Sequence, residues 1–276
     1  MTVLIIGGSG FLGTELVRQA VAAGHSTAAT FASRPRSSPE ITWHALDLRD
    51  ADRVEAVVAA AAPSLIVNAT SGFADWSVTA EGPIRLAMVA ARYGCRLVHV
   101  SSDAVFSGLS RVHYDETSLP DPVTPYGAAK AAAETGIRLL APDAVIVRTS
   151  LIIGDTRSEH VRAVHDLAAG TRDGVLFIDD FRCPVHVEDL AAALLELAFS
   201  DAHGMHHLAG AHAVSRHELG VLIAQRDGLD ASRLPAGLRA QSTLPGALDV
   251  RLDSRATQLK LRTILRGARQ FLTTTP

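Results

Sequence analysis

A tyrosine and a lysine four positions apart, Tyr126 and Lys130, form the first pair with the chemistry of an active site. On a helix, side chains at this spacing lie one above the other on the same face. An ammonium about 4 Å from a phenol, at an effective dielectric of about 20, stabilises the phenolate by roughly 4 kcal/mol, which lowers a tyrosine pKa by up to about three units. Tyr126 then becomes a usable general acid for a carbonyl oxygen, or a base for the reverse reaction.

Ser102 supplies a hydroxyl that complements this pair. It follows the expected strand Arg96–Ser101, and its side chain would hold the same carbonyl oxygen by a hydrogen bond. A Tyr–Lys pair at this spacing also occurs on ordinary helix surfaces, so the pair indicates an active site only together with other motifs. With those motifs, described next, we predict Ser102, Tyr126 and Lys130 as the catalytic residues. Tyr126 and Lys130 are also predicted to contact the cofactor, with Lys130 holding the ribose.

A glycine-rich segment runs from Gly7 to Gly13, between the expected strand Val3–Ile6 and the expected helix Phe11–Ala23. Glycines allow a tight turn and a close backbone approach to a pyrophosphate, whose charge then lies at the positive end of the helix. This position after the first strand predicts a dinucleotide site rather than a plain turn. The predicted cofactor contacts are Gly7, Gly10, Phe11, Leu12 and Gly13.

The segment after the second expected strand indicates which nicotinamide cofactor is bound. A carboxylate there binds the ribose 2′-hydroxyl of NAD and would repel a 2′-phosphate. Here Ser33 and Arg34 stand in that place, and no acidic residue occurs between Phe31 and Glu40. An arginine offers a planar fork to a phosphate, so the sequence favours NADP(H), the alternative being a solvated basic loop.

Two further strand ends are predicted to contact the cofactor. Asp47 and Leu48 follow the third strand and would flank the adenine. Asn68, Ala69 and Thr70 end or follow the fourth strand and would line the nicotinamide-side ribose and the pyrophosphate. Either stretch reads equally well as an ordinary loop.

Strands and helices alternate over the first part of the chain, which predicts an α/β fold with a doubly wound parallel sheet of the Rossmann type. Residues 1–150 are expected to form the dinucleotide-binding domain, with part of 184–200 packing back on it. Residues 151–276, where the alternation loosens, are expected to be mainly a smaller substrate-binding region. Besides those already named, the expected strands are Ser26–Phe31, Ile41–Leu46, Leu65–Asn68, Ala144–Thr149 and two short ones near Val175–Ile178 and Met205–Leu208. The expected helices are Asp52–Ala62, Val78–Tyr93, Tyr126–Leu140, Glu159–Ala169, Val187–Phe199 and Arg216–Arg226.

Charge and composition exclude other classes of protein. The 276 residues include 26 basic and 29 acidic side chains, so the net charge of −3 leaves no basic excess for nucleic acid. The long uncharged stretch 56–74 is interrupted by Pro63 and Gly72, which argues against a membrane span. The N-terminus lacks the pattern of a signal peptide, and the two cysteines have no disulfide or metal spacing, so we expect a cytoplasmic protein.

Together these residues resemble the extended branch of the short-chain dehydrogenase/reductase superfamily, and within it the family of dTDP-4-dehydrorhamnose reductase. The resemblance covers nearly the whole chain. It implies that Ser102, Tyr126 and Lys130 form the catalytic trio, that residues after Arg148 lie near the nicotinamide, and that the C-terminal region closes over a small-molecule substrate. A homodimer is common among such relatives. The matching motifs are Gly7–Gly13, Asp47-Leu48, Val67-Asn68-Ala69, Val100–Gly108, Tyr126–Lys130, Arg148-Thr149-Ser150 and Pro184–Ala191.

Some positions depart from that family pattern. Ala104 stands where these reductases usually carry a tyrosine, and the loop after Asn68 is shorter and contains Phe73 and Trp76. Glu15 matches a position used in a metal-linked dimer, but it has no companion acids in the sequence, so we assign no metal. The candidate substrate contacts are Phe73, Trp76, Asp103, Ala104, Arg182 and Arg251.

The same residues indicate the reaction. Dehydratases of the extended branch use an acidic pair after the strand-end hydroxyl, and here Asp103 is followed by Ala104. Epimerases retain NAD, whereas a phosphate-binding Arg34 suits a cofactor that is consumed in each turnover. We therefore expect an NADPH-dependent reductase of a nucleotide-linked 4-keto sugar, or of a related ketone from a specialised biosynthetic pathway. The alternatives are a nucleotide-sugar epimerase with tightly bound NAD and a non-catalytic, cofactor-binding regulatory subunit.

Overall fold

The computed structural model describes residues 2–33, 37–243 and 245–273. These residues form two compact units. The first contains the chain up to residue 102, residues 125–148 and residues 191–206, and the second contains residues 103–124, 149–190 and the chain from 207 onward.

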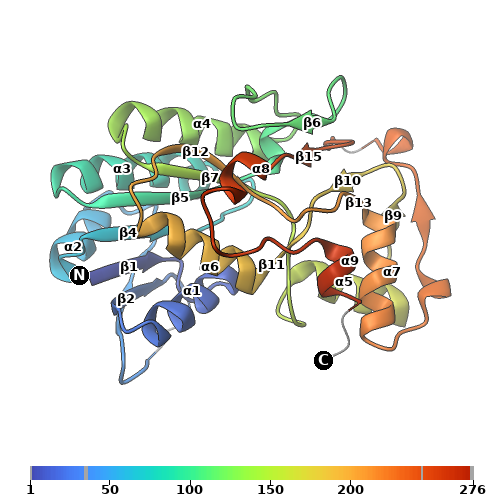
Figure 1. Ribbon diagram of the computed structural model, residues 1–276, viewed down its shortest axis with the longest axis horizontal. Helices are drawn as coiled ribbons and strands as arrows, with labels where there is room; N and C mark the ends of the chain where they lie inside the picture. The colour runs from blue at the N-terminus through green and yellow to red at the C-terminus, as the bar shows by residue number, and fades with distance from the viewer. Residues whose placement is uncertain (1, 34–36, 244, 274–276) are drawn as a thin grey trace. The chain divides into compact units, whose positions relative to one another are not determined.

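A central β-sheet dominates the first unit, and its strands run side by side in Figure 1. In the described part of the chain this sheet has seven strands, in the order β12-β7-β5-β4-β1-β2-β3. The order reverses direction between β1 and β4, as the predicted doubly wound sheet requires. The strands are β1 (Thr2–Ile6), β2 (Ser26–Phe31), β3 (Thr42–Ala45), β4 (Leu65–Asn68), β5 (Arg96–Ser102), β7 (Val145–Thr149) and β12 (Gly204–Leu208).

Parallel pairing brings the predicted site segments to one edge of this sheet. β4 pairs in parallel with both β1 and β5, β1 pairs with β2, and β2 pairs with β3. The carboxyl ends of these five strands therefore lie along the same edge. The glycine loop, Asn68 and Ser102 follow three neighbouring strands there, which is where open α/β sheets bind ligands.

Helices pack over the sheet because its strands are apolar on both faces. Leu4 and Ile6 of β1 alternate with Val3 and Ile5, and all four are buried. Leu4 and Ile6 belong to a core that also holds residues of α2, α3 and α4, such as Val54, Leu86 and Ile137. The helices of this unit are α1 (Phe11–Ala22), α2 (Ala51–Ala61), α3 (Gly82–Arg92), α4 (Pro125–Leu140) and most of α6 (Val187–Ala198).

The helix expected at Val78–Tyr93 begins differently. A π-helical turn, η1 (Ser77–Glu81), precedes α3, and Pro83 stands in the first turn of α3. Proline has no N–H to donate to the preceding turn and crowds that turn's carbonyl. A π-turn changes the hydrogen-bond register at such a point, so the helical path continues through it.

The second unit contains the longer helices α5 (Glu159–Ala169) and α7 (Arg216–Arg226), short helical segments and short strand pairs. Helices α5 and α7 share a core that includes Val161, Val164, Leu219 and Ile223. The strand pairs are β10 (Phe181–Arg182) with β13 (Val214–Ser215), β8 (Ile152–Ile153) with β11 (Val185–His186), β9 (Leu176–Phe177) with β14 (Ala236–Gly237), and β6 (His113–Tyr114) with β15 (Arg251–Leu252). Its short helical segments are η2 (Asp103–Val105), η3 (Ala231–Arg233), η4 (Arg239–Gln241), α8 (Arg255–Gln258) and α9 (Ala268–Phe271).

Two parts of the chain are more buried than their residue types indicate. The segment 229–246 has the glycine, proline and polar residues typical of a surface excursion, yet Leu234 within it is buried in the core shared by α5 and α7. His206 and His207 lie on β12, where the sequence predicts a strand, and they are 2% and 0% exposed because this strand belongs to the packed sheet. Among the described residues, no helix has both the length and the apolar character needed to span a bilayer.

Candidate active site

The glycine loop leaves no room for side chains at its turn. Gly7 has a positive φ of 79°, and its N–H donates to the Thr30 Oγ1 atom at 2.9 Å. A Cβ atom on Gly13 would lie 2.0 Å from the Gly7 carbonyl oxygen, so only glycine allows the first turn of α1 to pack there. The tight turn predicted from the sequence is therefore present.

The amino end of α1 has the features of a phosphate site. Gly10 is the N-cap and, having no side chain, provides no side-chain cap to the first turn, which contains Phe11, Leu12 and Gly13. A helix start of this kind presents backbone N–H groups and the positive end of the helix dipole. This cradle fits the pyrophosphate of a dinucleotide.

The residues predicted to contact the adenine side of the cofactor differ in exposure and in hydrogen bonding. Ser33 is exposed two residues after β2, whereas Arg34 lies outside the described residues. Arg49 donates to both oxygens of Asp47, and these bonds lower the pKa of the Asp47 carboxyl. Leu48 is buried in the core of α2 and α3, so its side chain is a packing group.

Asn68 shapes the turn after β4 through its side chain. Its amide donates to the His99 Nδ1 atom at 3.2 Å, and its Oδ1 atom accepts from the backbone N–H and the hydroxyl of Thr70. Burial, with the charge of Lys130, holds the pKa of His99 well below its usual range, so this histidine is neutral. Ala69 donates to the Ile6 carbonyl, which fixes the turn against β1. The turn therefore has a defined shape at the sheet edge.

The three predicted catalytic residues all belong to the first unit. Ser102 is the last residue of β5, Tyr126 is the second residue of α4, and Lys130 follows one turn later. Ser102 and Tyr126 are partly exposed, while Lys130 is only 2% exposed. The Lys130 ammonium donates to the Val100 carbonyl at 2.9 Å and to the Thr70 carbonyl at 3.4 Å. These bonds fix the amine at the carboxyl ends of β4 and β5.

The environment of Lys130 changes its proton affinity. Burial lowers the pKa of Lys130 from about 10.5 to about 8, and the carboxylate of Glu134 opposes that change. At neutral pH the amine thus remains largely protonated. A charged amine one turn below Tyr126 is what the predicted chemistry requires.

A buried polar network beside Lys130 is absent from the sequence-based prediction. Glu134 accepts hydrogen bonds from Arg148 and from the Ser101 hydroxyl. The sequence holds a signal for it, because Arg148 interrupts the apolar run of a buried strand and must have a partner there. Glu134 also follows Lys130 at the helical spacing that puts both on one face.

The two loop aromatics predicted as substrate contacts are exposed. Phe73 has a positive φ of 49° and is 64% exposed, and Trp76 is 50% exposed. The rings of Phe73 and Tyr126 lie 6.5 Å apart between centroids. Thr79 donates to the Phe73 carbonyl at 2.9 Å and so holds the loop in this form. The sequence-based choice of Phe73 thus lies next to the predicted proton donor.

Candidates in the second unit are mostly enclosed. Asp103 is buried and accepts from the Ser150 hydroxyl at 2.7 Å, and Ala104 follows it in η2. Arg182 is 6% exposed, pairs with Asp180 at 2.7 Å and donates to main-chain carbonyls of residues 247 and 248. This full set of contacts argues against Arg182 as a ligand of a substrate phosphate.

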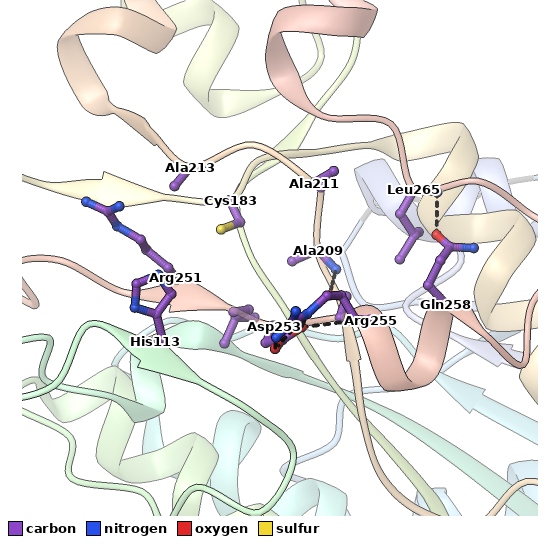
Figure 2. Close-up of a pocket in the computed structure, with 13 residues that line it drawn as sticks. His113, Cys183, Ala209, Ala211, Ala213, Arg251, Asp253, Arg255, Gln258 and Leu265 are labelled. Carbon is purple, nitrogen blue, oxygen red and sulfur yellow. Dashed lines mark hydrogen bonds and ion pairs between the residues drawn. The ribbon is translucent and has the colours of Figure 1, made fainter.

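Arg251, by contrast, lines a cavity of about 550 Å³ in the second unit. Figure 2 shows it there with His113 and Cys183, with Asp253 and Arg255 at the far side. Arg251 is held by a two-bond pair with Asp249. Burial raises the pKa of the Cys183 thiol to about 12, so this cysteine is a neutral packing group.

Within residues 2–33, 37–243 and 245–273, no group of three or more His, Cys, Asp and Glu side chains is arranged to hold a metal ion. Glu15, which matches a metal-linked position by resemblance, contacts Arg18 and Gln19 of its own helix.

The fold and these motifs define a dehydrogenase/reductase of the extended short-chain class. The family model described as the RmlD substrate binding domain matches residues 1–266, and the chain belongs to this family. A relative named dTDP-4-dehydrorhamnose reductase, from Mycobacterium tuberculosis, is 32% identical over 98% of this chain and 91% of its own length. Another, named dTDP-4-keto-6-deoxy-D-glucose reductase, from Streptomyces niveus, is 31% identical over 84% of this chain and 80% of its own length.

Solved structures show the same fold. A hypothetical dTDP-4-dehydrorhamnose reductase from Sulfolobus tokodaii matches with a TM-score of 0.82 and 26% identity, over 96% of this chain and 97% of that one. A dTDP-4-dehydrorhamnose reductase from Bacillus anthracis, solved in complex with NADP, matches with a TM-score of 0.81 and 22% identity, over 98% of this chain and 95% of that one.

Proposed function

We propose that this protein reduces the ketone of a nucleotide-linked 4-keto sugar to an alcohol, with NADPH as the reductant. The observation that carries the proposal is the buried Lys130 ammonium, which lies one helical turn from Tyr126 and is bonded to the strand that ends in Ser102. The substrate class follows the relatives, whose names specify dTDP-linked keto sugars.

The cofactor proposal rests on the sheet edge. The glycine cradle at α1 accommodates a pyrophosphate, and the chain after β2 carries Ser33 and Arg34 in place of an acid. The Bacillus anthracis neighbour was solved with NADP. The first unit would accordingly hold the dinucleotide, and the second unit would supply most of the substrate contacts.

The chain's own residues would carry the proton chemistry. When bound, NADPH supplies the hydride that forms the new C–H bond at the carbonyl carbon. The Ser102 hydroxyl donates a hydrogen bond to the carbonyl oxygen and orients it. Tyr126 transfers its phenolic proton to that oxygen as negative charge develops, which completes the alcohol. The Lys130 ammonium stabilises the phenolate that remains.

On the substrate side, we assign Phe73 to stacking against the sugar nucleotide, because its ring is exposed and lies near the ring of Tyr126. Trp76, Asp103, Ala104 and Arg251 complete the proposed contacts. A homodimer and a cytoplasmic location stay predictions from the sequence.

A direct assay tests the proposal. Purified protein is mixed with NADPH and a dTDP-4-keto-6-deoxy sugar, and the loss of NADPH absorbance is followed. Tyr126→Phe is expected to lower kcat by more than about a hundredfold, since general acid catalysis contributes on that order, while the affinity for NADPH is retained. Undiminished turnover by the variant would exclude Tyr126 as the acid. Tight NADPH binding without turnover of any ketone would instead support the regulatory-subunit alternative.

A further inference from the structure

The first unit buries a full ion pair directly beside the proposed catalytic residues. Glu134 and Arg148 are 1% and 2% exposed. Arg148 donates from Nε to Glu134 Oε1 at 3.0 Å and from Nη2 to Glu134 Oε2 at 2.8 Å. Apolar side chains of similar volume usually stabilise a core as well as such a pair does, so its presence here calls for a role other than stability.

The network joins three elements at the level of the site. Glu134 lies one turn after Lys130 and two turns after Tyr126 on α4, so the three share a helix face. Ser101, which donates to Glu134 Oε1 at 2.6 Å, is the residue before Ser102 on β5. Arg148 belongs to β7, the next strand of the sheet. The carboxylate of Glu134 is therefore held in position by hydrogen bonds from both strands.

Besides Tyr126, the titratable side chains of Glu134 and His99 interact with Lys130. Glu134 lies on its own helix, and His99 lies on β5, the strand against which that helix packs. His99 is buried and neutral, because burial and the Lys130 charge hold its pKa well below its usual range. Glu134 thus provides the negative charge that favours the protonated amine, against the effect of burial.

We propose that Glu134, held by Arg148 and Ser101, is a positioning residue that keeps the Lys130 amine protonated and directed toward the ends of β4 and β5. This inference rests on the proposed ketone reduction for its functional meaning, because Tyr126 needs a charged partner in each turnover. Arg148 and Ser101 act through Glu134, since their hydrogen bonds prevent its carboxylate from turning away.

The sequence offers a direct way to observe this amine. It contains two lysines, Lys130 and Lys260, and Lys260 is exposed. Protein labelled with ¹³C at lysine Cε therefore gives two resonances, which a Lys260→Arg variant assigns. The titration midpoint of Lys130 can be followed in the intact protein without any turnover, with Lys260 as the internal reference.

Glu134→Gln removes the charge and keeps the shape. In the variant, the Lys130 midpoint is expected to fall by about one pH unit or more, since an opposite charge at this range has that effect, while the Lys260 midpoint stays where it is in the wild type. The alkaline limb of the kcat profile is expected to move to lower pH by the same amount. Glu81→Gln, which removes the partner of Arg85 elsewhere in this unit, is the matched control and should move neither.

A second variant covers the case in which Glu134→Gln leaves too unstable a protein. Glu134→Gln combined with Arg148→Met removes both buried charges, and the Lys130 midpoint should still fall. An unchanged midpoint in either folded variant would overturn the proposal and leave Glu134 with a structural role alone. A shifted midpoint in a protein that reduces no ketone would uphold the role of Glu134 and refute the proposed function, so the two failures are distinguishable.

Discussion

The two units use buried charge in different ways. In the first unit, Lys130, Glu134 and Arg148 are buried around the helix that carries Tyr126. In the second unit, the buried Arg182 pairs with Asp180 and bonds to main-chain carbonyls more than 60 positions away in the sequence. The first arrangement sets the charge next to a proposed reaction site, whereas the second holds short, irregular segments together. Burial of an arginine or lysine therefore does not by itself identify an active site.

The largest expected effect tests the structural role of the second arrangement. Arg182→Ala should lower the free energy of unfolding by about 3–5 kcal/mol, because it removes one member of a buried pair, while the contact from Arg216 to Asp180 is longer, at 3.5 Å. Urea denaturation measures it. Arg251→Ala is the control, since Arg251 is 35% exposed in its pair with Asp249 and should cost no more than about 1 kcal/mol. Equal losses of unfolding free energy in the two variants would show that the buried pair of Arg182 is no more stabilising than the exposed pair of Arg251.

The next prediction tests the charge in the first unit through pH. The pKa of Lys130 is about 8 in the folded protein against 10.5 in an unperturbed lysine. Between these values the unfolded chain binds more protons than the folded one, so the Lys130 contribution to the free energy of unfolding rises as pH increases. The rise amounts to up to about 3 kcal/mol.

The Lys130→Met variant lacks the pH-dependent contribution of Lys130 to the free energy of unfolding. Its other titratable groups are the same as those of the wild type. The difference in unfolding free energy between the two proteins should therefore change over this range, in favour of the wild type at higher pH. Denaturation at a series of pH values measures that difference. A constant difference would show that burial does not lower the lysine pKa.

The smallest expected effect concerns the exposed loop of the first unit. Phe73→Gly should raise KM for the sugar nucleotide about tenfold, because the variant loses the stacking contact of the ring, and a tenfold change corresponds to about 1.4 kcal/mol. It should change kcat little. Because glycine adopts a positive φ without strain, the free energy of unfolding should stay equal or rise by up to about 1 kcal/mol. Phe73→Ala, which keeps the Cβ and hence the strain, separates the two effects. Unchanged KM in both variants would remove Phe73 from the substrate site.

The fold of the first unit could be predicted from the sequence better than that of the second, for a physical reason. Its strands are continuous apolar runs and its helices have regular apolar spacing, so Leu65–Asn68 and α4 are found close to where the sequence places them. The π-turn before α3 was missed because Pro83 perturbs hydrogen bonds without interrupting the apolar pattern. The strand pairs of the second unit have two residues each, too few to show any periodicity.

The candidate site was predictable to the extent that its motifs are local. The glycine loop and the Tyr126–Lys130 spacing are short-range features. Arg182, by contrast, looked like a phosphate ligand because a sequence shows a charge but not its distant partners near residue 248. The sequence did not identify Glu134 as a site residue, because its role depends on an ion pair with Arg148, which lies on a separate strand.

Two of the places where the chain passes from one unit to the other lie beside the proposed catalytic residues or the network that supports them. Ser102 is the last residue of its segment in the first unit and Asp103 the first of its segment in the second, and the same holds for Arg148 and Thr149. One peptide link, about 3.8 Å between Cα atoms, therefore ties the serine that would orient the carbonyl to the unit that contains Arg251. A movement of the second unit on binding the proposed substrate would reach Ser102 through this single peptide bond.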